Sequence, residues 1–150
     1  MKKLLPLLFL ALVFLGGCFG SQATVNPYPN DPHECANNLT YDGSFLSGRT
    51  FKSHAFVKGV TQADAMKRVA RYILSDGWQI NNTDSKLGII SASQTVSYGQ
   101  GKTAPLNVGV EQIKGGVNVT MSFSVYSGAT APVEGVRDFF CSVIGAVQGK

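Results

Sequence analysis

Residues Val117–Val125 read VNVTMSFSV and carry the clearest indication of the fold. Apolar and polar residues alternate strictly here, which is the period of a β-strand with one face in a core and the other in water. Just before this strand, Lys114-Gly115-Gly116 separates it from a second predicted strand, Leu106–Ile113, and favours a hairpin. We therefore expect an antiparallel sheet with one buried face and one wet face.

Further strands are predicted on the N-terminal side of this hairpin. Ile89–Val96 and Trp78–Asn82 are strand-like and flank a turn at Asp84–Gly88. Arg49–Lys58 also alternates between apolar and polar residues, so it is predicted to be a strand with one buried face.

Two helices complete the predicted fold. The first begins at a capping-box-like pair, Thr61 and Asp64, and ends at Asp76-Gly77. Its apolar residues recur at helical spacing: Met66, Val69, Ala70, Ile73 and Leu74. The second follows Pro132, with the apolar stripe Val133, Val136, Phe140, Val143, Ile144 and Val147. The sequence thus predicts an α+β domain of order β-α-β-β-β-β-α, with two helices packed on one face of an antiparallel sheet of about four to five strands.

The N-terminus has the organisation of an export signal. Met1-Lys2-Lys3 is a positive start, Leu4–Leu15 is apolar, and Gly16-Gly17 precede Cys18. This ending resembles the bacterial lipobox. The resemblance implies that Cys18 receives a diacylglyceryl group and becomes the first residue of the mature protein, so that residues 1–17 are a lipoprotein signal peptide.

The alternative, an uncleaved transmembrane helix, is disfavoured because the apolar stretch Leu4–Phe19 is shorter than the ~20 residues that a span requires. Phe19, in place of the aspartate that often retains lipoproteins in the inner membrane, resembles the signal for sorting to the outer membrane. That resemblance implies an outer-membrane anchor facing the periplasm. Residues 18–38, polar and rich in proline, are expected to form a tether, and residues 39–150 a single α+β domain.

Two cysteines remain in the mature chain, Cys35 and Cys141. In an oxidising compartment an even pair is expected to close, so we predict a Cys35–Cys141 disulfide. The chain-entropy model assigns ~4 kcal/mol to a loop of this length. The alternative is a pair of free thiols.

The middle of the chain resembles a known group of lipoproteins. Gly77-Trp78-Gln79-Ile80, then Asp84, then Gly88-Ile89-Ile90-Ser91-Ala92-Ser93 form a helix stop, a strand, a turn and a second strand. This pattern resembles the helix-grip domains of BamC-like outer-membrane assembly lipoproteins. The resemblance implies a fold, and no functional residue is carried over from it.

The charge distribution does not favour nucleic-acid binding. The formal charge of +4 falls to about +2 when Lys2 and Lys3 leave with the leader (4 − 2), and the remaining cations are spread from Arg49 to Lys150 without a basic run. The segment Gly99–Thr103 ends like a phosphate-binding loop, but Val96 stands where the motif needs a glycine, and a strand follows instead of a helix. We interpret it as part of a loop, Ser97–Pro105.

Metal and hydrolase chemistry are also poorly supported. His33, Glu34, Cys35 and His54 lack the ordered spacing of zinc ligands, and Cys35 is better explained as half of a disulfide. No Gly-x-Ser-x-Gly elbow is present. We expect no cofactor, no metal and no enzymatic activity.

The remaining candidates are contacts for a partner. A small basic face of the first helix and the loop before the central hairpin supply them: Lys67, Arg68, Arg71, Tyr98, Gln100 and Lys102. The alternative is that the basic face contacts only solvent. The first hypothesis is a membrane-anchored module that binds or scaffolds an envelope protein. The second is a small-ligand carrier or enzyme inhibitor with its site between sheet and helices, and an enzyme is the third.

Overall fold

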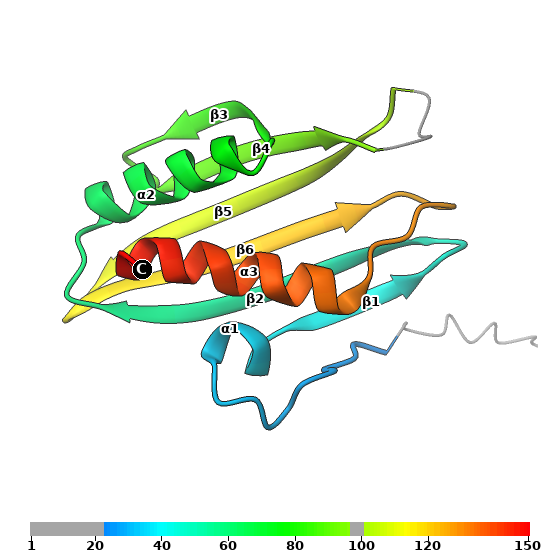
Figure 1. The fold of residues 1–150 in the computed structure, drawn as a ribbon, viewed down its shortest axis with the longest axis horizontal. Helices are drawn as coiled ribbons and strands as arrows, with labels where there is room; N and C mark the ends of the chain where they lie inside the picture. The colour runs from blue at the N-terminus through cyan, green and yellow to red at the C-terminus, as the bar shows by residue number, and fades with distance from the viewer. Residues whose placement is uncertain (1–22, 97–100) are drawn as a thin grey trace, which may run out of the picture.

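The computed structural model describes residues 23–96 and 101–150 of the 150-residue chain. Figure 1 shows one open sheet with two long helices lying across the same face of it. The elements, in chain order, are α1 (Glu34–Asn37), β1 (Thr40–Ser44), β2 (Gly48–Lys58), α2 (Gln62–Ser75), β3 (Gln79–Asp84), β4 (Ile89–Thr95), β5 (Thr103–Ile113), β6 (Gly116–Val125) and α3 (Val133–Gln148).

The sheet has the strand order β1-β2-β6-β5-β4-β3, and every neighbouring pair is antiparallel. The predicted α+β class is therefore confirmed. The predicted counts were too low, because the described residues form six strands and three helices rather than four to five strands and two helices. The missed strand, β1, reads TYDGS and is half-buried throughout, so it has no alternation to detect. The missed helix, α1, spans only four residues and is too short to show a helical period.

Strand pairing places the apolar half of each alternating strand on the face that the helices cover (Figure 1). Phe51 of β2 lies opposite Phe123 of β6, which in turn lies opposite Leu106 of β5. Phe140 of α3 and Ile73 of α2 pack onto this layer and are completely buried. The result is a two-layer core in which each predicted apolar stripe meets another.

The first long helix begins and ends where the sequence predicted. The Thr61 hydroxyl accepts a hydrogen bond from the Asp64 backbone N–H at 3.2 Å, which satisfies one of the free donors of the first turn. At the other end Gly77 has a φ of +89°, and the Trp78 backbone N–H donates to the Ile73 carbonyl at 2.9 Å. This turn brings Trp78 back onto the core, where its side chain is buried.

The N-terminal segment folds back onto the domain. We expected residues 18–38 to form a tether, but Cys35 and Ala36 are buried in the described part of this segment. Val25 pairs with Tyr41 of β1 through two backbone hydrogen bonds of 2.8 and 2.9 Å. Two segments predicted to be separate, tether and domain, are thus joined from residue 25 onward.

The predicted disulfide is confirmed. Cys35 of α1 and Cys141 of α3 are joined by an S–S bond of 2.04 Å across a sequence separation of 106 residues. The bond ties the start of the folded chain to its last helix. Within the described residues, no helix is both long enough and apolar enough to cross a bilayer.

Candidate binding surfaces

Residues 25–38, which we call the N-terminal clasp, cover an edge of the sheet that β1 leaves open. β1 pairs only with residues 48–52 of β2, so the rest of β2 lacks a neighbouring strand on that side. The Glu34 carboxylate accepts a hydrogen bond from the Phe56 backbone N–H at 2.7 Å. The Asn38 side-chain amide donates to the His54 carbonyl at 3.0 Å. These side chains take the place of a strand and protect the edge from pairing with another chain.

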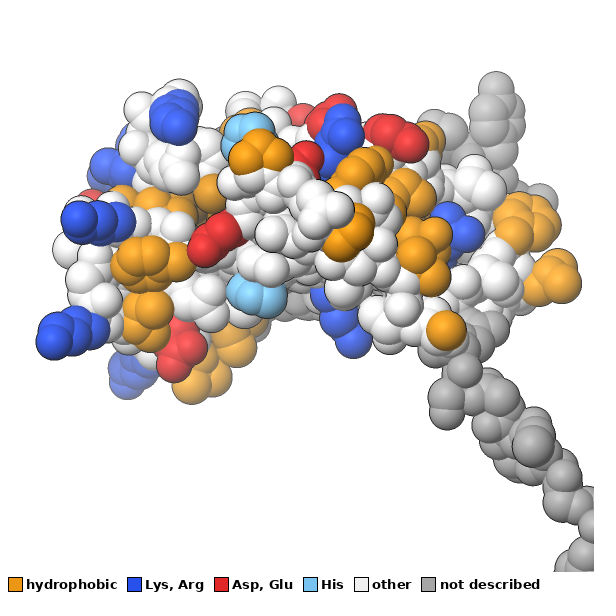
Figure 2. All heavy atoms as spheres, turned by 90° about the horizontal axis from the view of Figure 1, so that it is seen from below, with side chains coloured by type: hydrophobic (Ala, Val, Ile, Leu, Met, Phe, Trp, Pro, Cys, Tyr) orange, Lys and Arg blue, Asp and Glu red, His pale blue; other side chains and the backbone are white. Residues whose placement is uncertain are grey.

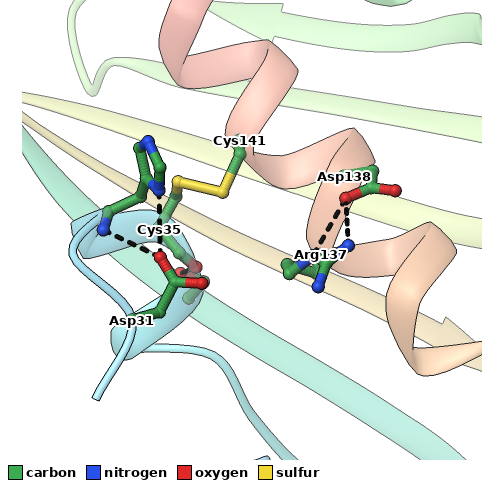
Figure 3. Close-up of polar contacts among 7 residues, drawn as sticks. Asp31, Cys35, Arg137, Asp138 and Cys141 are labelled. Atoms are coloured by element: carbon green, nitrogen blue, oxygen red, sulfur yellow. Dashed lines mark hydrogen bonds and ion pairs between the residues drawn. A yellow bond between two sulfur atoms is a disulfide. The ribbon is translucent and has the colours of Figure 1, made fainter. Parts of the chain in front are cut away.

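Figure 3 shows the charged groups on either side of the disulfide. Asp31 accepts hydrogen bonds from the backbone N–H of His33 at 2.9 Å and lies 3.0 Å from its ring Nδ1. The backbone N–H of His33, followed by its ring, holds the pKa of Asp31 below the ordinary value of an aspartate. Across the disulfide, Asp138 pairs with Arg137 at 2.8 Å and raises the pKa of that guanidinium.

Arg137 also holds the clasp to α3. Its guanidinium lies 4.9 Å from the centre of the Tyr28 ring, within the range of a cation–π contact. The clasp is therefore attached to α3 at two points, Tyr28 and Cys35.

A groove of about 610 Å³ runs between the clasp and α3 beside the disulfide. His33 and Glu34 line one side of it, and Asp138 and Ser142 line the other. A hydrolase would need a hydrogen bond between the serine hydroxyl and the histidine base. Among the contacts of the described residues, none joins Ser142 to His33.

Metal chemistry finds no better support in the described part of the chain. His33 and His54, which we considered as ligand candidates, lie on different elements: His33 directly precedes α1, and His54 lies on β2. No group of three or more His, Cys, Asp or Glu side chains within residues 23–96 and 101–150 is close enough to hold a metal ion.

The second surface is the open face of the sheet, opposite the helices. The polar half of each alternating strand lies here, as the sequence predicted. A hollow of about 590 Å³ crosses this face and is lined from five strands and by Asn38, which directly follows α1. Its lining comprises Asn38, Thr40, Lys52, Ser53, His54, Ile89, Asn107, Val108, Gly109, Thr120, Met121 and Ser122.

Gly109 gives this hollow its depth. It stands opposite Thr120 in the β5–β6 pairing, and a Cβ at this position would lie only 2.6 Å from the Thr120 hydroxyl. Lys52 and His54 are the titratable residues in the lining. Lys52 forms no ion pair with any residue that the structure describes. The hollow therefore combines short hydrogen-bonding side chains with an unpaired cation.

In the basic face predicted on the first long helix, one of the three cations also bonds to α3. Lys67, Arg68 and Arg71 are all exposed on α2. The Arg68 guanidinium, however, donates a 2.6 Å hydrogen bond to the carbonyl of Val147 in the last turn of α3. A cation at this end satisfies a free carbonyl and complements the helix dipole, so Arg68 joins the two helices.

The loop candidates are only partly described. Tyr98 and Gln100 lie outside the described residues, as do Cys18 and the predicted signal peptide. The Lys102 ammonium lies 4.5 Å from the centre of the Tyr126 ring, a cation–π contact at the end of the sheet where β6 finishes. The structure brings neither Lys102 nor the α2 cations into the hollow of the open face.

The sequence did not reveal the hollow itself. Alternation predicted that Thr120 and Ser122 are wet, but only strand pairing places them beside Gly109 and Asn107. The signal that could have found it is the isolated glycine at a polar position of β5, because a glycine inside a strand often marks a close approach of another group.

A smaller crevice lies between the sheet and the start of α3. Trp78, Phe123 and Phe139 line it, and its volume is about 220 Å³. The indole of Trp78 lies 5.4 Å from the Phe139 ring and 5.7 Å edge-on from the Phe123 ring. This volume is below the roughly 300–1,000 Å³ of ordinary small-molecule pockets.

Comparison with known proteins gives little further information. No protein-family model matches this chain, and no curated protein sequence matches it. A solved structure described as the crystal structure of Ara h 8.0201 is similar, with 14% sequence identity and a TM-score of 0.48, over 67% of this chain and 94% of that one. At this identity and TM-score the similarity carries no inference about function.

Proposed function

We propose that this protein is an outer-membrane lipoprotein, anchored at Cys18 and facing the periplasm, whose open sheet face binds an acidic segment of an envelope protein without catalysing a reaction. The observation that carries the proposal is the hollow of about 590 Å³ on that face. It extends across five strands, which suits an extended chain better than a compact small molecule.

The chemistry of the hollow supports a polar, negatively charged occupant. Asn107, Thr120 and Ser122 offer hydrogen-bond donors and acceptors along its floor. Lys52 contributes a positive charge, and the lining holds no Asp or Glu side chain. A carboxylate in the occupant would find a cation that no described acidic residue already neutralises.

Site-specific photo-crosslinking in the native envelope tests this proposal. We expect a photoreactive residue at Asn107 to capture one envelope protein, whereas one at Arg71, exposed on the helix side, captures none. The charge of the hollow is tested with Lys52→Glu, which should reduce the crosslink from position 107 at least tenfold.

Lys67→Glu is the matched control, because Lys67 is an exposed lysine of α2 that lines no part of the hollow. It should leave the crosslink unchanged. Capture from position 71 but not from 107, or equal yields with Lys52→Glu and wild type, would refute binding at the open face.

A small-ligand carrier is the second candidate, favoured by the aromatic crevice at Trp78, Phe123 and Phe139. Its volume of about 220 Å³ admits only a small or partly inserted ligand, which is why this function ranks second. Trp78 is the only tryptophan of the chain, so its fluorescence reports directly on this crevice. A saturable change in that fluorescence on adding envelope lipid extract, with no crosslink from position 107, would favour the carrier.

A further inference from the structure

The turn between β1 and β2 exposes two large apolar side chains at its tip. The Leu46 residue is 82% exposed and Phe45 is 52% exposed. Exposed single hydrophobic residues are common, but two adjacent ones at the tip of a turn form a projecting apolar point.

The polar residues of the same turn are directed into it. The backbone N–H of Ser44 donates to the Ser47 hydroxyl at 3.0 Å, and the backbone N–H of Ser47 donates back to the Ser44 hydroxyl at 3.3 Å. The Phe45 carbonyl accepts a hydrogen bond from the Gly128 backbone N–H at 2.7 Å. The turn is thus fixed by its serines and by a neighbouring loop, and only the apolar side chains extend away from it.

The chain enters the folded domain beside this turn. Val25 pairs antiparallel with Tyr41, so the residues before Val25 run in the direction in which β1 proceeds, toward Ser44 and the tip. In Figure 1 the described chain begins toward the same end of the molecule as the β1–β2 turn. Figure 2 shows exposed hydrophobic side chains at that end, and others at the opposite end.

The distance to the lipid anchor is therefore short. Ala23 is the fifth residue after Cys18, and five residues span at most about 18 Å even when fully extended. Had residues 18–38 all been tether, four times as many residues would have separated the domain from the bilayer. Because the N-terminal clasp is folded against the domain, the segment that connects the domain to the anchor is short. It therefore holds the Phe45–Leu46 end close to the membrane.

The surroundings of the tip suit a lipid headgroup region. The Lys102 ammonium lies 4.5 Å from the centre of the Tyr126 ring. Both residues lie at the same end of the sheet as the tip, because β6 ends at Val125, which pairs with Arg49 just after the β1–β2 turn. Aromatic rings and long basic side chains are the residue types that settle at the boundary between water and lipid.

We propose that the Phe45–Leu46 tip inserts into the phospholipid bilayer that holds the lipid anchor and gives the domain a second attachment point. The proposal rests on the lipidation of Cys18 in the proposed function. Two attachments fix the orientation of the sheet, with the β3–β4 and β5–β6 turns at the end away from the membrane (Figure 1).

The test uses the full lipidated protein, in which Cys18 is acylated and the other two cysteines are paired, so that an added cysteine is the only free thiol. Leu46→Cys is labelled with a polarity-sensitive fluorophore in vesicles of phosphatidylethanolamine and phosphatidylglycerol. Leu87→Cys is the matched control, because Leu87 is a 69% exposed leucine in the β3–β4 turn, at the other end of the sheet.

We expect the fluorophore at position 46 to shift to shorter wavelength and to be quenched at least twofold by spin-labelled lipids, with no change at position 87. Equal quenching at the two positions, or none at either, overturns the proposal. Native mass spectrometry of the same preparation reports acylation of Cys18 separately. An acylated protein that floats with vesicles but shows no quenching at position 46 therefore refutes only the insertion of the tip, whereas an unmodified Cys18 refutes the anchor.

A second measurement does not depend on labelling. In a mature chain made without residues 1–17 and with Cys18→Ser, which has neither leader nor acyl chains, Phe45→Ser together with Leu46→Ser should weaken vesicle binding at least tenfold. Both side chains are exposed, so the thermal melting curve should be unchanged. Equal binding with and without the two apolar side chains would also overturn the proposal.

Discussion

The sheet is held together in two different ways on its two sides. From β3 to β6 each strand pairs with the strand before or after it in the chain, so residues 79–125 form a simple meander. The N-terminal clasp, residues 25–38, is attached by distant contacts instead: Cys35 to Cys141, Tyr28 to Arg137, and Glu34 to Phe56. The meander is therefore stabilised by local pairing, and the clasp by contacts that close long loops.

The largest expected effect comes from opening the longest of these loops. Replacing both cysteines, Cys35→Ala with Cys141→Ala, should lower the free energy of unfolding by about 4–5 kcal/mol, because a disulfide across this separation restricts the unfolded chain strongly. Urea unfolding followed by Trp78 fluorescence measures the loss. Hydrogen exchange should accelerate first in residues 25–38, with the meander affected last.

A loss below about 1 kcal/mol, or equal acceleration of exchange in the meander, would show that the clasp does not depend on the disulfide. Wild-type protein treated with a reductant is the control for the substitutions themselves, and it should match the double variant.

Local pairing is tested at two glycines of the meander that both have positive φ. Gly88 has a φ of +70°, and an added Cβ would collide with the Val110 carbonyl, whereas Gly115 has a φ of +87° and nothing within 4 Å. Gly88→Ala should therefore cost about 2–3 kcal/mol of unfolding free energy. Gly115→Ala carries the backbone strain alone, about 1 kcal/mol. Equal losses in urea unfolding would contradict the close approach of β4 to β5 at Gly88.

The smallest expected effect concerns the charge of the clasp. His33 holds the pKa of Asp31 below that of an aspartate in the unfolded chain. The resulting stabilisation is present above the ordinary aspartate pKa of ~4 and is lost as the pH falls through the lower pKa of the folded protein. Asp31→Asn should therefore be less stable than wild type at pH 6, and the difference should shrink toward pH 3.

Urea midpoints at the two pH values measure this difference. A gap that stays constant between pH 6 and pH 3 would show that Asp31 acts through its shape rather than its charge. Asp64→Asn on α2 is a suitable control, because Asp64 is an exposed aspartate that lies far from the clasp in the sequence and receives its hydrogen bond from Thr61.

The candidate surfaces were predictable to different degrees. Alternation in Arg49–Lys58 and Val117–Val125 predicted a wet sheet face, and the structure has one. The hollow in that face depends on Gly109 lying opposite Thr120, and nothing local to either residue encodes their pairing. Arg68 was predicted to belong to a basic face, but its bond to Val147 depends on the packing of α2 on α3.

The amino-acid sequence was sufficient for the features that repeat along a few consecutive residues: the half-buried strands, the ends of α2, the apolar stripes of the two long helices and the pairing of two cysteines. These follow from side-chain period, backbone preference and the number of thiols, which are local or compositional properties. Tertiary structure alone decided that residues 25–38 close the β2 edge, that Gly109 opens a hollow, and that Phe45 and Leu46 lie at the end where the chain enters. Those features join residues far apart in the chain, and their energies exist only once the sheet has brought the partners together.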